Sequence, residues 1–277
     1  MENSELLTSV LSKLDRLLDR YLDGSMNDID FADRIAFRWN PSAKSLKPAR
    51  KPVRINAGDL LGLDRQKELL TKNTFNFVRG NRANNVLLWG ERGTGKSSLV
   101  KAMLTAFSAE GLRMAQVYKH DILTIQDMYG LLADKPEYRF IIFIDDLSFE
   151  ESQTDYKELK TIMDGGLEEI PENILFYATS NRKHLIATRF SDRDNDVIRP
   201  SDNLEEKISL ADRFGLRLGF HHITQDTYLE IAELYADKYG VRLDRSEFRE
   251  CALRWSLEAG GRNGRIAEQF VRGLGRQ

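Results

Sequence analysis

The stretch Trp89-Gly90-Glu91-Arg92-Gly93-Thr94-Gly95-Lys96-Ser97-Ser98 decides the fold of this 277-residue chain. From Gly90 to Ser97 it fits the pattern G-x-x-x-x-G-K-[ST], in which a glycine-rich loop holds phosphate groups. The apolar run Val86–Trp89 precedes it and is typical of a buried strand, and the helix-prone run Ser98–Leu104 follows it. The pattern is informative only between a strand and a helix, and the sequence provides both.

The residue types in this phosphate loop (Gly90–Ser97) fit nucleotide chemistry. Its glycines allow backbone conformations that a Cβ would block, so that successive N–H groups at the start of a helix can hold phosphate oxygens. Lys96 is expected to reach the β- and γ-phosphates, and the Ser97 hydroxyl to complete the shell of a Mg²⁺ ion. A structural turn between a strand and a helix is the alternative, but it explains neither Lys96 nor Ser97. The predicted nucleotide-binding residues here are Gly90, Glu91, Arg92, Gly93, Thr94, Gly95, Lys96, Ser97 and Ser98.

The overall composition is that of an ordinary globular protein. Hydrophobic residues make up 41% of the chain and charged residues 30%. The net charge of −2 gives no reason to expect a protein that coats nucleic acid, although it leaves room for a local basic patch. A single cysteine, Cys251, excludes an internal disulfide and fits a reducing compartment. With neither a long apolar run nor a signal-peptide core, the chain is expected to be cytoplasmic and without a membrane span.

A second apolar run carries two acidic residues at its end. Residues 140–144 read Phe-Ile-Ile-Phe-Ile, typical of a strand covered on both faces, and Asp145 and Asp146 follow. In parallel sheets, ligands bind at the carboxyl ends of the strands. We therefore expect Asp145 to hold Mg²⁺ and Asp146 to polarise the attacking water. A helix cap after a core strand is the alternative, but it accounts for only one of the two carboxylates.

Further strands are predicted at 112–118, 174–179 and 216–220, which gives an α/β fold with a five-stranded parallel sheet flanked by helices. Asn181 follows the 174–179 strand and could hydrogen-bond the γ-phosphate or orient the hydrolytic water, although Ser-Asn is also ordinary turn chemistry. Arg213 precedes the last strand, and its planar fork suits phosphate oxygens; a surface pair with Asp212 or Glu206 is the alternative.

The remaining chain divides into three parts around a nucleotide-binding domain expected at 56–222. Residues 1–40 are predicted to be an N-terminal helical arm, with an amphipathic helix at 4–21 that packs on its own domain or docks elsewhere. Residues 41–55 contain three prolines and five unpaired cations and are predicted to be a basic linker; a strap on nucleic acid is disfavoured because no aromatic residue interleaves with the charges. Residues 223–277 show three helical stripes and are predicted to form a small α-helical lid.

Taken together, these motifs resemble the AAA+ ATPases over residues 55–277. The resemblance rests on the phosphate loop, Asp145-Asp146, Ala178-Thr179-Ser180-Asn181-Arg182 and Ser209-Leu210-Ala211-Asp212-Arg213-Phe214-Gly215. More narrowly, these segments and Asn84–Gly90 are similar to a bacterial AAA+ family known only as a domain of unknown function.

This resemblance implies ATP and Mg²⁺ as cofactors and gives several residues a role. Residues 59–62, with Leu61 and Gly62, lie where AAA+ proteins hold adenine, and Asn181 matches the residue that senses the γ-phosphate. Arg213 matches the arginine finger, which reaches the nucleotide of the neighbouring subunit and implies a homo-oligomeric ring or open ring. Arg265 matches the second sensor on the lid, and Arg262 is close enough in sequence to compete for that role.

The predicted function is Mg²⁺-dependent ATP hydrolysis that drives a conformational switch or a remodelling step on a protein or nucleoprotein partner. The alternative is a nucleotide-gated binding or loading module with little turnover, because the aspartate at position 146 is one methylene shorter than the glutamate of many AAA+ motors. A protein-threading motor is a third possibility, but its only candidate loop, Met128-Tyr129-Gly130, lies in a helix-like run.

Overall fold

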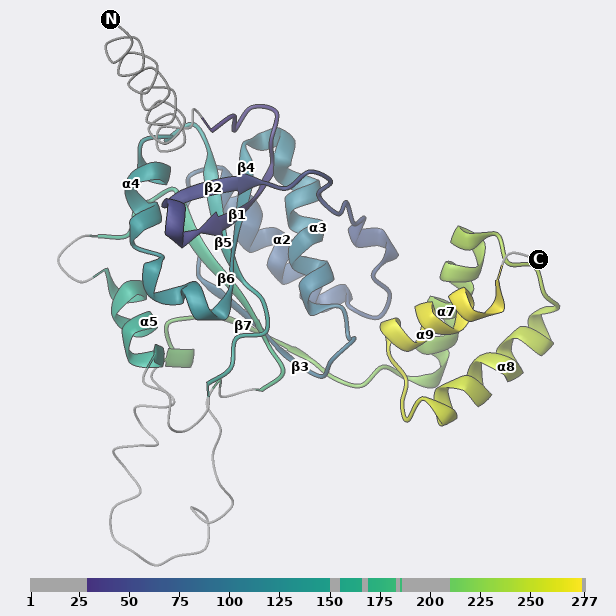
Figure 1. Cartoon of the computed structure of the whole chain (residues 1–277). Coiled ribbons are helices and arrows are strands. Elements are labelled where there is room, and N and C mark those ends of the chain that lie inside the picture. Colours follow the sequence, from purple (N-terminus) through teal and green to yellow (C-terminus); the bar gives the residue numbers. More distant parts are fainter. Residues whose placement is uncertain (1–28, 150–154, 166–168, 183–184, 186–209, 276–277) are drawn as a thin grey trace, which may run out of the picture.

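The protein is described from a computed structural model, shown in Figure 1. The structure describes residues 29–149, 155–165, 169–182, 185 and 210–275. The helix expected at 4–21 lies outside these residues. A layered α/β part and a smaller unit of three helices account for the described chain, and the three helices lie to one side of the sheet (Figure 1).

Within the described residues, one sheet of seven strands forms the centre of the larger part. Its order is β2-β1-β4-β5-β6-β3-β7. The strands are β1 (Ala36–Asn40), β2 (Ser45–Pro48), β3 (Val86–Gly90), β4 (Leu112–Val117), β5 (Arg139–Ile144), β6 (Ile174–Ser180) and β7 (Leu216–Phe220). All neighbouring strands are parallel except β1 and β2, which form an antiparallel hairpin. The five parallel strands predicted from sequence are therefore present, in the order β4-β5-β6-β3-β7.

Helices cover both faces of this sheet, which explains the uninterrupted apolar runs of its central strands. The helices α2 (Asp64–Val78) and α3 (Lys96–Phe107) pack with Ile141 and Phe143 of β5 in one core. The helices α4 (Asp127–Ala133) and α5 (Asp155–Asp164) pack with Ile142 and Ile144 in the other. Short 3₁₀ helices connect these elements: η1 (Pro41–Ala43), η2 (Ala57–Asp59), η3 (Ser108–Glu110) and η4 (Lys119–Thr124).

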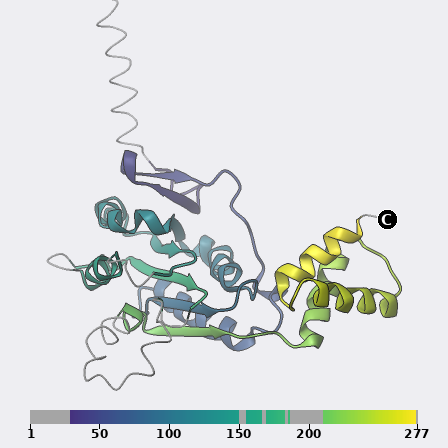
Figure 2. The same ribbon diagram turned by 60° about the horizontal axis from the view of Figure 1, so that its bottom comes forward.

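The hairpin β1–β2 corrects the expected sheet of five parallel strands and the expected division of residues 36–48 between an arm and a linker. Phe37 and Trp39 are buried while Arg38 between them is exposed, which is the period of a half-buried strand. Pro48 is tolerated because β2 is the outermost strand, where no neighbour needs its N–H. Figure 2 shows the hairpin at one edge of the sheet and β7 at the other. The hairpin thus extends the sheet beyond β4.

The three helices of the smaller unit are α7 (Gln225–Tyr239), α8 (Arg245–Glu258) and α9 (Gly264–Leu274), which pack around a core of their own. This confirms the helical lid predicted for the C-terminal part. A side chain caps the start of each helix: Thr224 Oγ1 accepts from the N–H of Thr227 at 3.1 Å, Asp244 Oδ1 from that of Ser246 at 2.9 Å, and Asn263 Oδ1 from that of Ile266 at 3.0 Å.

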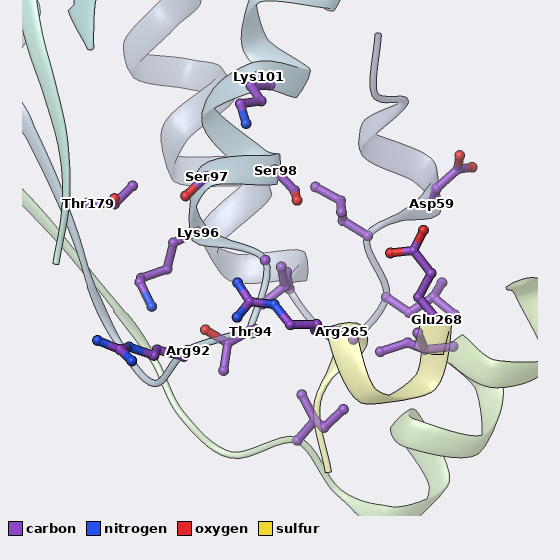
Figure 3. A pocket seen from close by; sticks show the side chains of 18 of the residues that line it. Asp59, Arg92, Thr94, Lys96, Ser97, Ser98, Lys101, Thr179, Arg265 and Glu268 are labelled. Atoms are coloured by element: carbon purple, nitrogen blue, oxygen red, sulfur yellow. The ribbon is translucent and has the colours of Figure 1, made fainter. Parts of the chain in front are cut away.

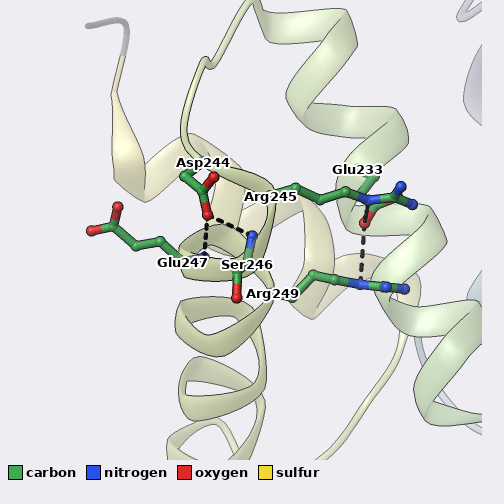
Figure 4. Close-up of polar contacts among 6 residues, drawn as sticks. All are labelled: Glu233, Asp244, Arg245, Ser246, Glu247 and Arg249. Atoms are coloured by element: carbon green, nitrogen blue, oxygen red, sulfur yellow. Dashed lines mark hydrogen bonds and ion pairs between the residues drawn. The ribbon is translucent and has the colours of Figure 1, made fainter.

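Figure 4 shows the cap of α8 beside a small ionic cluster on the lid. Glu233 of α7 pairs with both Arg245 and Arg249 of α8, at 3.2 Å each. These ion pairs join two lid helices at their surface, where such pairs typically contribute below about 1 kcal/mol each.

Candidate functional site

A pocket of about 620 Å³ lies between the carboxyl ends of the sheet strands and the lid. The phosphate loop and the start of α3 form one wall, and α7 and α9 form another (Figure 3). Of the sequence-predicted residues, those that line this pocket are Leu61, Arg92, Gly93, Thr94, Gly95, Lys96, Ser97, Ser98, Asp145, Asp146, Asn181 and Arg265. The prediction and the cavity therefore coincide in most of their residues.

The phosphate loop needs its first glycine because the loop passes very close to the neighbouring strand. Gly90 has φ 137°, and a Cβ there would lie 1.9 Å from the carbonyl oxygen of Phe220 in β7. Neither Gly90 nor Glu91 lines the pocket, but their carbonyl oxygens both accept hydrogen bonds from the Lys96 ammonium. These two residues therefore hold Lys96 in place from behind.

Lys96 is a buried cation with neutral partners. The residue is 7% exposed, and its ammonium donates to the carbonyl of Gly90 at 2.8 Å and to Asn181 Oδ1 at 3.3 Å. Among the described residues no carboxylate lies within ion-pair distance of it. A buried ammonium without a counter-ion is costly, so the site favours an anionic ligand such as a phosphate group.

The electrostatics of the pocket agree with this arrangement. Burial lowers the pKa of Lys96 below its ordinary value of 10.5, and the nearby cations Arg265 and Arg92 lower the pKa further. The carboxylates of Asp146 and Asp145 act in the opposite direction. Lys96, Arg92 and Arg265 thus gather around one end of the pocket (Figure 3), as a triphosphate would require.

One carboxylate oxygen of Asp145 accepts hydrogen bonds from two hydroxyl groups. Ser97 Oγ and Thr179 Oγ1 each donate to Asp145 Oδ1 at 2.6 Å. Hydroxyl and carboxylate oxygens are the ligands that Mg²⁺ prefers, and Mg²⁺ commonly keeps several waters and shares substrate phosphates. The residues present therefore fit a magnesium ion bound through Ser97 and Asp145, with Thr179 fixing the carboxylate from behind.

Asp146 and Asn181 form the next pair along the sheet edge. Asp146 has φ 58°, a left-handed conformation that aspartate tolerates better than most residues, and its N–H donates to Thr179 Oγ1 at 2.9 Å. Asn181 Nδ2 donates to Asp146 Oδ1 at 2.6 Å, while its Oδ1 accepts from Lys96. Asn181 therefore links the buried cation to the exposed carboxylate.

The lid closes the pocket from the side of α9. Arg265, in the first turn of α9, lines the pocket, whereas Arg262 lies next to Tyr228 in the lid and is not among the lining residues. The N–H of Gly264 donates to the carbonyl of Gly93 at 3.0 Å, so α9 begins in direct contact with the phosphate loop. Between the two arginines, the structure places only Arg265 at the predicted site.

The far end of the pocket is more apolar and contains residues that the sequence analysis missed. Leu60, Leu61 and Leu63 approach it from the residues before α2. Gly62 does not line it; a Cβ on Gly62 would lie 2.7 Å from Thr227 Cγ2, so this glycine allows a close approach of the lid. The missed residues around the whole pocket are Leu63, Lys101, Thr179, Ile223, Ile231, Tyr235, Gly264 and Glu268. Only the packing of the lid on the sheet could have revealed those on α7 and α9.

Two sequence candidates lie away from the pocket. Arg213 pairs through Nε with Asp164 Oδ1 at 2.6 Å, and both side chains are more than one third exposed. Asp212, the partner considered for it, pairs instead with Arg217 at 3.3 Å. Met128 and Tyr129, the candidate threading loop, are buried in α4.

Comparisons with known proteins support the fold described above. Two solved structures of RuvB from Thermotoga maritima are similar to this chain. The Holliday junction branch migration motor gives a TM-score of 0.52 at 18% identity, with 79% of this chain and 61% of that chain covered. A point variant of the same protein gives 0.55 at 16% identity, with 78% and 63% covered. At this level of identity the likeness shows the fold alone.

A curated protein, the 26S proteasome regulatory subunit 6B homolog of Encephalitozoon cuniculi, is 29% identical over 192 residues. The match covers 61% of this chain and 49% of the relative, so the chain spans about half of that protein's length.

A search of the described residues for membrane-spanning helices found none with the required length and apolar character.

The strand order and these matches confirm the resemblance to the AAA+ superfamily. The model of one family, described as a protein of unknown function (DUF815), matches residues 32–277, which is nearly the whole chain. The chain therefore belongs to the DUF815 family and has the AAA+ fold.

Proposed function

We propose that this protein binds Mg·ATP in the pocket between the phosphate loop and the lid and hydrolyses it. The observation that carries the proposal is the buried Lys96 ammonium, which has only neutral hydrogen-bond partners among the described residues and faces a polar cavity. A triphosphate would provide the missing negative charge. The apolar end, with Leu61 and Tyr235, suits a nucleobase.

In this proposal each residue has a separate task. Lys96 neutralises charge on the β- and γ-phosphates, and Ser97 and Asp145 hold the metal ion. A Mg²⁺ ion held by these two residues would supply positive charge to the phosphate oxygens. Asp146 accepts a hydrogen bond from the attacking water, and Asn181 holds Asp146 and Lys96 at a fixed separation.

Two arginines complete the proposed site. Arg265 extends from the lid towards the phosphates, so lid position and nucleotide state are coupled. Arg213 does not line the pocket of its own chain, and we propose that it acts on the nucleotide of a neighbouring subunit in a homo-oligomer. The proposed use of hydrolysis is a conformational switch or a remodelling step on a macromolecular partner.

Three variants test this function. Lys96→Ala should abolish binding of a fluorescent ATP analogue, and Asp146→Asn should bind ATP but not hydrolyse it. Arg213→Ala should retain binding and lose turnover by about 10³-fold or more. Full hydrolysis by Arg213→Ala would remove the neighbouring-subunit role, and unchanged binding by Lys96→Ala would contradict the site itself.

A second candidate function is a nucleotide-gated binding module with little turnover. It is favoured by Asp146, whose short carboxylate is already engaged by Asn181 at 2.6 Å. Hydrolysis and ATP-dependent assembly should be measured on the same sample by phosphate release and light scattering. Assembly without steady phosphate release would favour the module, and steady release would favour the hydrolytic switch.

A further inference from the structure

An unusual run of positive charge precedes the pocket in the sequence. From Arg34 to Gly58, both included, the chain contains seven cations and no acidic residue, although the net charge of the whole chain is −2. We call Arg38, Lys47, Arg50, Lys51 and Arg54 the basic hairpin surface. All five residues are exposed, and within the described residues none of them forms an ion pair. Lys44, by contrast, pairs with Asp127 at 3.3 Å.

The hairpin places part of this charge on one face. Arg38 of β1 and Lys47 of β2 are direct cross-strand partners, so their side chains emerge from the same side of the sheet. The neighbours of Arg38, Phe37 and Trp39, point to the opposite side and are buried. The two charges are therefore fixed in place by a packed core behind them.

An aromatic stack adjoins these charges, which the sequence alone did not reveal. Arg38 pairs in register with Gln116 of β4, and Tyr118 follows two residues later on the same face. The guanidinium of Arg38 lies 5.4 Å from the Tyr118 ring centroid. The His120 ring stacks on Tyr118, with centroids 5.6 Å apart and planes 8° apart. Tyr118 is 38% exposed and the His120 side chain 79% exposed, so the stack is open to solvent.

The surface is separate from the nucleotide pocket but continuous with it along the chain. In the sheet, β5 and β6 lie between β4 and β3, which leads into the phosphate loop. The segment that follows Pro48 carries Arg50, Lys51 and Arg54. It contacts α3 through a hydrogen bond of 3.2 Å from the N–H of Ile55 to Thr105 Oγ1. The chain then enters η2, which lies at the rim of the pocket. The chain therefore runs from this surface along α3 to the rim of the pocket, and the two sites use different residues.

We propose that the basic hairpin surface, with Tyr118 and His120, binds single-stranded nucleic acid. Unpaired cations match a phosphate backbone, and an exposed aromatic stack beside them gives bases a platform. Paired bases are hidden inside a duplex, so the stack favours a single strand. An acidic peptide or an anionic membrane would use the charges but not the stack.

The test is fluorescence anisotropy with the full chain and labelled oligo-dT and oligo-U that lack a 5′ phosphate. Arg38→Ala/Lys47→Ala should weaken binding at least about tenfold and reduce the slope of log K against log salt by about 1.4, or about 0.7 per lost phosphate contact. Tyr118→Ala should weaken binding about tenfold, whereas Tyr118→Phe should bind like the wild type. Preference for oligo-dT or oligo-U identifies DNA or RNA as the source.

Matched controls separate this proposal from general polyanion binding and from the proposed ATPase. Arg245→Ala/Arg249→Ala removes the same charge from the lid (Figure 4) and should leave binding unchanged. Lys96→Ala should also leave oligonucleotide binding unchanged, so failure of the nucleotide site does not affect this readout. Equal losses in the hairpin and lid variants would overturn the proposal. The proposal would also be overturned by a second result. In that result heparin, duplex DNA or phosphatidylcholine vesicles containing phosphatidylserine bind as tightly as the oligonucleotides, and Tyr118→Ala has no effect.

Discussion

Ser97 and Thr179 both donate a hydrogen bond to the same oxygen of Asp145, at 2.6 Å each. Ser97 comes from the phosphate loop and Thr179 from the neighbouring strand β6, so the carboxylate is held from two elements. If Ser97 turns towards a metal ion, Thr179 still keeps Asp145 in position.

Replacing Thr179 by valine keeps its shape but removes the hydroxyl. We expect Thr179→Val to weaken Mg²⁺-dependent ATP binding about tenfold, because Asp145 loses one of its two fixing bonds and Asp146 N–H loses its acceptor. Thr179→Ser should retain binding close to the wild type. Titration of Mg²⁺ at fixed ATP measures the effect, and equal affinities for the valine and serine variants would contradict the positioning role.

Lys96→Met should increase the thermal stability of the nucleotide-free protein while abolishing ATP binding. Burial lowers the pKa of Lys96, so folding opposes its protonated form. Removing that charge should raise the free energy of unfolding by about 0.5–2 kcal/mol. Thermal melts of both proteins without nucleotide measure the difference.

The pH dependence of the stability difference between Lys96→Met and the wild type tests whether the Lys96 charge causes it. Between the lowered pKa of Lys96 and 10.5 the unfolded chain binds more protons than the folded chain, so the wild type gains stability as pH rises through this window. The advantage of Lys96→Met should therefore be full below the lowered pKa of Lys96 and shrink as the pH rises towards 10.5. An advantage that stays constant over this range would show that the charge is not its cause.

Asp164 contacts Arg213 through Nε, and within the described residues the two terminal nitrogens of this guanidinium form no ion pair, so they suit a phosphate group. If Arg213 acts on a neighbouring subunit, Asp164→Ala should lower the ATPase rate several-fold by letting the guanidinium rotate, with nucleotide affinity unchanged. Asp164→Asn, which keeps an acceptor oxygen, should restore most of the rate. Because both side chains are partly exposed, stability should change by less than about 1 kcal/mol in either variant.

Gly93 has φ 77°, and a Cβ there would lie 2.5 Å from Asn263 Oδ1 in the cap of α9. Gly93→Ala should therefore weaken ATP binding and destabilise the protein by about 1–3 kcal/mol. Asn263→Ala alone should cost about 1 kcal/mol through loss of the cap. The double variant should lose less stability than the sum of the two single losses, because the smaller side chain at position 263 relieves the contact. Chemical denaturation measures these losses, and additive losses would argue against this contact.

The sequence predicted most of the phosphate-binding side of the pocket because each element carries its own signal. A glycine loop with lysine, and carboxylates after an apolar strand, must meet at the carboxyl edge of a parallel sheet. Thr179 was missed because its role depends on register: Ile144 pairs with Ala178, which sets Asp145 beside Thr179. Tyr235 and Glu268 were missed because they reach the pocket only through the packing of the lid.

The hairpin at 36–48 was hidden for a different reason. Its strand signal is only the alternation of Phe37 and Trp39 with Arg38, and prolines and cations surround it. These residues fit an extended tether equally well until a sheet edge is available to pair with them. The choice between Arg262 and Arg265 likewise needed the turn at Asn263, which starts α9 and directs only the later arginine to the pocket.

The hairpin has a practical consequence for producing this protein. A shortened chain that starts at residue 56 would retain every nucleotide-binding motif but lose β1, the partner of Met114, Ala115 and Gln116. The open backbone of β4 would then be available to strands of other molecules, and the apolar surface that Phe37 and Trp39 cover would face water. Such a fragment should precipitate or form aggregates, so expression trials should keep everything from residue 29 onward.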